Sequence, residues 1–178
     1  FEILDPDLWE SLHQNPVALL AQIPQHRLDE FARDDAYLTA LEARVRIAGP
    51  GGSRVVPIGQ FFVLPAKDPT RETVLERNEV VTEILLPPAE TGLRSSYRKV
   101  RGRGAWDFAL AGVALALLMR DGTIERARVV LSGAAPVPWR AQAAEKALVG
   151  KAITPETAAA AAEAAMQGAE PMAKNGYK

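Results

Sequence analysis

Apolar and polar residues alternate with a period of two along residues 42–47, which is the pattern of a half-buried β-strand. Residues 49–52 read Gly-Pro-Gly-Gly, a turn signal, so residues 54–57 are expected to return as a second strand. The aromatic pair at positions 61–62 is interpreted as core packing. A further strand is predicted over residues 79–86, where two prolines end it.

A second group of strands is predicted after a boundary at residues 89–94. A glycine-rich loop at residues 101–105 separates its first two strands, and the hairpin dipeptide Asp121-Gly122 joins the second strand to the third. This order of strand, loop, strand, turn and strand predicts a three-stranded antiparallel meander. Its strands are expected over residues 95–101, 108–120 and 124–131.

The last third of the chain is predicted to be helical. A proline can start a helix over residues 139–149, and a glycine ends it. Thr154 is the expected N-cap of a second helix, with Pro155 at its first helical position. Residues 158–165 are nearly all alanine, and this lack of bulky side chains suggests close packing against another element. Sheet first and helices after predict an α+β fold.

The composition excludes several classes of function. The 178 residues carry 21 basic and 22 acidic side chains, so nothing favours nucleic acid or an anionic membrane as the main partner. The lack of cysteine excludes disulfides, thiolate catalysis and iron–sulfur ligation by this chain. Neither His13 nor His26 lies in a metal-ligand pattern. No apolar run is long enough to span a bilayer and no secretory signal is seen, so a cytoplasmic protein is expected.

The most specific segment contains Lys99, Arg103 and Asp107 at four-residue spacing. Lys99, at a strand end, can offer a positive charge to an electron-rich ring or a phosphate. The glycines that follow it let the backbone approach a flat ligand closely, and Asp107 can hold Arg103 in a bidentate pair. The basic run across residues 94–103 suits a small phosphate-bearing ligand or an ordinary solvated face. A surface hairpin with a structural salt bridge explains the same residues, so both interpretations stay open at this point.

Several segments resemble the flavin subunit of the molybdenum hydroxylases, the family of xanthine dehydrogenase, carbon monoxide dehydrogenase and aldehyde oxidoreductase. Lys99, Arg103, Asp107 and Ala109 are similar to the pattern at the start of that subunit's C-terminal domain. Residues 79–87 resemble the strand that closes its flavin-binding domain. Other similar passages are residues 45–62, 133–150 and 175–178.

The resemblance implies a division into domains. Residues 36–90 would be the final part of the FAD-binding domain. Residues 91–178 would form the C-terminal domain, with a three-stranded antiparallel sheet packed by helices. Residues 1–35 do not resemble the family and stay unassigned, and three prolines there allow only short helices. The glycine-rich loops that cradle the FAD pyrophosphate in that family have no match in this sequence.

The resemblance also implies an oxidoreductase function, in which electrons pass from iron–sulfur clusters through FAD to an external acceptor. FAD would contact this chain, whereas the molybdopterin cofactor and the 2Fe–2S clusters would belong to a large and a small partner subunit. Lys99 would stabilise negative charge on reduced flavin, and the loop over residues 102–106 would control the access of the acceptor. No catalytic residue and no metal ligand are predicted. The expected cofactor contacts are Val81, Lys99, Arg103, Trp106 and Asp107.

Two other functions stay open. Because the phosphate loops have no match, the chain would in the first alternative keep the family fold, bind no flavin and serve in the assembly of a larger complex. In the second, the basic loop would serve an enzyme that acts on a phosphate-bearing ligand. The sequence shows neither a Ser/His/Asp set nor a nucleophile elbow, so this alternative ranks last.

Overall fold

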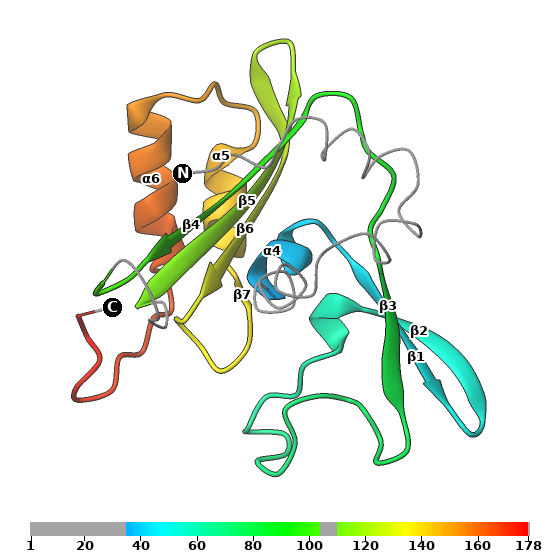
Figure 1. The fold of residues 1–178 in the computed structure, drawn as a ribbon. Helices are drawn as coiled ribbons and strands as arrows, with labels where there is room; N and C mark the ends of the chain where they lie inside the picture. The colour runs from blue at the N-terminus through cyan, green and yellow to red at the C-terminus, as the bar shows by residue number, and fades with distance from the viewer. Residues whose placement is uncertain (1–34, 104–109, 178) are drawn as a thin grey trace.

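A computed structural model describes residues 35–103 and 110–177, which form two antiparallel sheets with helix α4 between them (Figure 1). The first sheet has the strand order β2-β1-β3, and the second has the order β4-β5-β6-β7. Helices α5 and α6 cover the face of the second sheet that lies away from α4 (Figure 1). This arrangement confirms the predicted α+β class. The elements are α4 (Asp35–Ala40), β1 (Arg44–Gly49), β2 (Gly52–Pro57), the 3-10 helix η1 (Ile58–Gln60), β3 (Val80–Leu85), β4 (Leu93–Val100), β5 (Ala111–Arg120), β6 (Thr123–Ser132), β7 (Trp139–Arg140), α5 (Gln142–Leu148) and α6 (Pro155–Ala165).

The first sheet follows the predicted hairpin. β1 is its central strand, and the alternation of side chains places Ile47 in a buried apolar cluster. Gly49 pairs with Gly52, so the turn consists of the two residues between them, as expected. Gly52 has a φ of +114°, a backbone conformation that favours glycine. The rings of Phe61 and Phe62 meet edge to face at 5.4 Å and pack against the cluster, which confirms them as core residues.

A bulge in β3 decides which of its residues face this cluster. The register between β3 and β1 shifts between Arg46 and Ile47, and Thr82 is the extra residue on β3. In a regular strand, Val81 and Ile84 are three positions apart and would face opposite sides of the sheet. Because of the bulge, both pack against the same cluster.

The second sheet confirms the predicted meander and adds a strand to it. The turn between β5 and β6 has positive φ at both Asp121 and Gly122, 47° and 78°, as a type I′ hairpin requires. Residues 139 and 140 form β7 and pair with β6, so the sheet has four strands among the described residues. The prediction of a helix that starts at residue 139 is therefore wrong for its first residues, and α5 begins at Gln142.

The side chain of Glu145 explains why α5 starts late. It is buried, and its Oε1 accepts hydrogen bonds from the backbone N of Val129 at 3.1 Å and from Nε of Arg140 at 2.7 Å. Its Oε2 accepts from Nη2 of Arg140 at 2.9 Å. The hydrogen bonds to Glu145 raise the pKa of the Arg140 guanidinium above its ordinary value. Arg140 bonds to Glu145 of α5 from an extended segment that pairs with β6. A helix that began at residue 139 would break this pairing.

Helix α4 joins the two sheets. Ala36 and Ala40 pack on β5 and β6 of the second sheet, whereas Leu38 lies in the buried cluster of the first. Glu42, just beyond the helix, accepts a hydrogen bond from Nε of Arg128 on β6 at 2.7 Å. The small alanine side chains let the helix approach the second sheet closely. The same short helix therefore positions one sheet against the other.

Helix α6 confirms its predicted cap. Oγ1 of Thr154 accepts a hydrogen bond from the backbone N of Thr157 at 3.2 Å, and Pro155 occupies the first helical position. The alanine run packs against another element, as predicted, but along one face only: Ala161 is buried in the cluster with Ala144 and Leu148 of α5. Most other positions of the run face outward, because α6 forms the outer layer and packs mainly on α5 (Figure 1).

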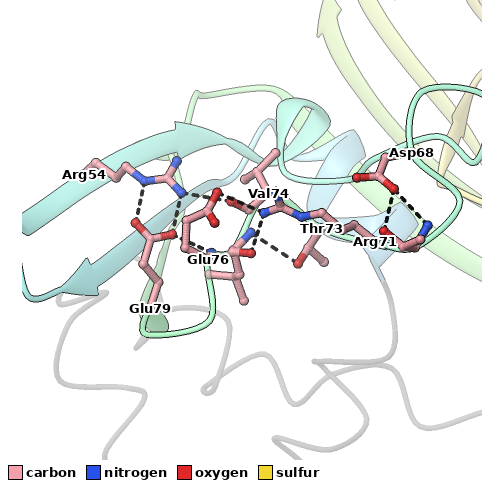
Figure 2. Close-up of polar contacts among 9 residues, drawn as sticks. Arg54, Asp68, Arg71, Thr73, Val74, Glu76 and Glu79 are labelled. Carbon is pink, nitrogen blue, oxygen red and sulfur yellow. Dashed lines mark hydrogen bonds and ion pairs between the residues drawn. The ribbon is translucent and has the colours of Figure 1, made fainter.

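A polar network holds the segment before β3 against β2 (Figure 2). Arg54 donates from Nε and Nη2 to the carboxylate of Glu79 at 3.0 and 2.7 Å, and Nη2 also donates to the carbonyl O of Val74 at 3.1 Å. Glu79 also accepts from the backbone N of Glu76 at 2.9 Å. Arg71 donates to the carboxylate of Glu76 at 3.2 Å. Through Arg54, the network holds the segment between η1 and β3 against strand β2.

Acid is expected to weaken this connection through Glu79. Hydrogen bonds from Arg54 lower the pKa of Glu79 from the ordinary 4.5 to about 2. A carboxyl group whose folded pKa is lowered stabilises the folded state above its unfolded pKa. The contribution is therefore complete above pH 4.5 and is lost as the pH falls towards 2. Thermal unfolding at a series of pH values across this window should show a shallower acid loss in Glu79→Gln than in wild type. Arg54→Met should likewise show a shallower acid loss, because the Glu79 pKa then returns towards its ordinary value. An acid slope equal to that of wild type in both variants would contradict the assignment.

Candidate functional site

The alternation of β4 divides the basic run between two faces of the sheet. Ser95, Tyr97 and Lys99 share the face on which α4 packs, whereas Arg94 and Arg98 lie on the opposite face. The run is therefore not one basic patch. Of the three cations that β4 itself carries, only Lys99 is on the α4 side.

Lys99 lies near the end of β4 with its side chain exposed. Its Nζ is 5.7 Å from the centroid of the Tyr97 ring, which is a cation–π distance. In the sheet register, Lys99 pairs with Gly112 of β5, and Gly112 pairs with Ser132 of β6. Tyr97, Lys99, Gly112 and Ser132 are called the Lys99 cluster below. It places a positive charge on a sheet face beside a position that has no side chain.

The ring of Tyr97 is held by contacts from two elements. Its Oη lies 3.0 Å from Oγ of Ser132 on β6. The ring is tilted by 58° against that of Tyr37 on α4, with the centroids 6.4 Å apart. Oη of Tyr37 in turn lies 2.8 Å from Oγ of Ser95. The aromatic group next to the Lys99 ammonium therefore has little freedom to move.

Gly112 leaves the space in which the Tyr97–Ser132 hydrogen bond forms. A Cβ at this position would lie 2.3 Å from Oγ of Ser132 and 2.9 Å from Oη of Tyr97. Both distances are shorter than side chains tolerate. The glycine is thus required by packing across three strands, a reason that differs from the turn geometry that explains Gly52.

Val81 lies on β3 in the first sheet, whereas Lys99 lies on β4 in the second. Its side chain is half-buried and packs against the apolar cluster around Ile47. Within the described residues β3 is an edge strand, paired with β1 on one side. The predicted flavin contact of Val81 stays a prediction.

The remaining predicted contacts lie in and around the loop after β4. Arg103 is exposed just beyond the strand. Trp106 and Asp107 lie outside the described residues, so the pair of Arg103 with Asp107 and the role of Trp106 remain predictions.

The sequence analysis did not single out Tyr97, Gly112 or Ser132. A signal existed for Tyr97, because residues two apart on a strand share a face and Tyr97 is two residues before Lys99. No comparable signal existed for the other two. Their position beside Lys99 depends on the register of three strands.

The described residues 35–103 and 110–177 contain no group of three or more His, Cys, Asp or Glu side chains that could hold a metal ion. In the same residues, no helix has both the length and the apolar character needed to cross a membrane.

The C-terminal part of the chain thus combines a meander, helices that cover one of its faces and a cation near the end of its first strand. Residues 95–178 match the family of the CO dehydrogenase flavoprotein C-terminal domain. This match places residues 95–178 in the family and confirms the resemblance found in the sequence for that part of the chain. Residues 1–47 match a family described as a protein of unknown function (DUF3417), and most of that stretch precedes the described residues.

Individual relatives agree with this assignment. The chain is 37% identical over 132 residues to the carbon monoxide dehydrogenase medium chain of Hydrogenophaga pseudoflava. The aligned region covers 74% of this chain and 44% of that relative. It is 36% identical over 139 residues to the aldehyde oxidoreductase FAD-binding subunit PaoB of Escherichia coli. That alignment covers 78% of this chain and 40% of that subunit. Among solved structures, a carbon monoxide dehydrogenase from Hydrogenophaga pseudoflava aligns with a TM-score of 0.68 and 39% identity, over 78% of this chain and 46% of that chain. The chain spans less than half the length of these relatives.

Proposed function

We propose that this chain supplies the ring-side part of a flavin site in the FAD-binding medium subunit of a molybdenum hydroxylase. The observation that carries the proposal is the exposed Lys99 ammonium on the α4 face of the second sheet, in a chain of this family. In such a complex, electrons would pass from iron–sulfur clusters through FAD to an external acceptor. The molybdopterin cofactor and the 2Fe–2S clusters would lie in a large and a small partner subunit.

The chemistry of the Lys99 cluster fits a flavin ring. A bound FAD would supply the redox chemistry itself. Lys99 offers a compact positive charge to an electron-rich ring, and its neighbour Gly112 adds no side chain that would block approach to the sheet. The role of Lys99 is electrostatic, because a fixed cation favours negative charge placed beside it. Val81 and Arg103 are further proposed contacts, from β3 and from the loop after β4.

Replacement of Lys99 tests this role. In the flavin-loaded full-length protein within its complex, Lys99→Met is expected to lower the flavin midpoint potential, because loss of the cation disfavours the more negatively charged, reduced form. A shift of about 30 mV corresponds to a tenfold change in a two-electron equilibrium. The matched control is Arg98→Met, which removes the adjacent cation from the opposite face and should leave the potential unchanged. An unchanged potential and reoxidation rate in Lys99→Met would contradict the proposal.

The other proposal, an assembly module that binds no flavin, rests on the lack of a match to the pyrophosphate loops of the family. A visible spectrum of the purified full-length protein separates the two. Bands of oxidised flavin support the flavin site. A colourless protein that cannot be loaded with FAD supports the assembly module.

A further inference from the structure

We infer that Tyr97 is a positioning residue, which holds the Lys99 ammonium at one place on the sheet face by a cation–π contact. This inference rests on the proposed function, because the ammonium matters only if its charge acts on a ligand. The observation behind it is the 5.7 Å distance between Nζ of Lys99 and the centroid of the Tyr97 ring.

A lysine side chain has a flexible four-carbon stem, so an exposed lysine does not by itself define where its charge lies. Lys99 is exposed near the end of β4, so its position on the strand does not by itself fix the ammonium. The face of the Tyr97 ring carries negative charge density and attracts the ammonium. The ring therefore limits the volume over which the charge is spread.

The ring can do this only if it is itself fixed. Its hydroxyl is bonded to Ser132 at 3.0 Å, and its side packs against Tyr37 with 6.4 Å between the centroids. Ala114, Val130 and α4 surround it in the same apolar cluster. Strand β6 and helix α4 thus hold the Tyr97 ring, and the ring in turn contacts the Lys99 ammonium.

The contacts separate two functions of the tyrosine. The hydroxyl anchors the ring to Ser132, and the ring face holds the cation. Tyr97→Phe removes the anchor and keeps the ring. Tyr97→Leu removes the ring. A trifluorinated phenylalanine at position 97 keeps the size and shape of a ring but removes the negative charge of its face, so it tests the electrostatic part without a cavity.

The experiment measures the flavin midpoint potential of the flavin-loaded complex, with flavin content and thermal unfolding as checks on folding. Tyr97→Leu and the trifluorinated variant are each expected to lower the potential by at least about half of the shift seen in Lys99→Met. Tyr97→Phe keeps the ring and its packing against Tyr37, Ala114 and Val130, so it should keep most of the wild-type potential. The double variant Tyr97→Leu/Lys99→Met should show no larger shift than Lys99→Met alone, because the ring acts only through the cation.

Two results would overturn the inference, and they can be told apart. If Lys99→Met shifts the potential while both ring variants keep the wild-type value, Tyr97 does not position the charge and the proposed flavin role of Lys99 stands. If Lys99→Met itself leaves the potential unchanged, both the proposed role and the positioning role fall. Should Tyr97→Leu not fold, the trifluorinated variant decides alone.

Discussion

Glu145→Ala is expected to lower the free energy of unfolding by about 2–4 kcal/mol, because the loss of one partner from a buried pair leaves the other partners unpaired. The substitution leaves the backbone N of Val129 without its acceptor and the Arg140 guanidinium without its counter-ion. The effect should stay below that of a fully buried pair, since the Arg140 side chain is 38% exposed. Strand β7 and the start of α5 depend on the same carboxylate, so this corner of the sheet should open first.

Urea unfolding of the purified protein measures this loss. Glu145→Gln keeps a neutral oxygen for the Val129 amide and should cost less than the alanine variant. Glu125→Gln is the matched control at the surface, where the carboxylate is 2.6 Å from Arg120 and the two side chains are 50% and 62% exposed. That pair should contribute about 0.5 kcal/mol or less. Equal losses in Glu145→Ala and Glu125→Gln would refute the structural role of the buried carboxylate.

Gly112→Ala is expected to destabilise the protein by about 1–3 kcal/mol, because a methyl group has no room at this position. The added carbon would lie 2.3 Å from Oγ of Ser132 and 2.9 Å from Oη of Tyr97. The hydrogen bond between these two hydroxyls must break or the strands must separate. The same substitution should disturb the ring beside Lys99 and so alter the proposed flavin site.

A double variant identifies the contact responsible. Ser132→Ala removes the closer of the two atoms, so Gly112→Ala/Ser132→Ala should be less destabilised than the sum of the two single variants. The control is Gly59→Ala, since no atom lies within 4 Å of a Cβ built there. Gly59→Ala should change the stability little. Strict additivity of the two substitutions at 112 and 132 would show that the clash is not the cause.

Local patterns in the sequence were sufficient for most of the elements. The alternation of residues 42–47 and the prolines after residue 86 predicted strands that the structure contains as β1 and β3. Asp121 and Gly122 predicted their hairpin because few other pairs accept positive φ at both positions. Thr154 predicted the start of α6 because its hydroxyl can bond to a free backbone N–H of the first turn.

Predictions failed where a distant contact outweighed the local pattern. Residues 139 and 140 have a proline before them and a helix after them, yet they form β7 because Glu145 holds Arg140 beside β6. The alanine run of α6 predicted packing against another element, but propensity for a helix did not show that α6 would lie in the outer layer with one face on α5.

The candidate site shows the same division. Lys99 and its place at the end of a strand followed from spacing and strand periodicity, which depend on neighbours in the chain. The register of β4, β5 and β6 and the position of α4 decided the surroundings of Lys99. They place it over the ring of Tyr97 and opposite Gly112, which pairs in turn with Ser132. Secondary structure arises from interactions between residues close in the chain, so a single sequence carries its signal. The surroundings of a charge arise from residues up to tens of positions apart, and those become neighbours only when the strands pair and the helix packs.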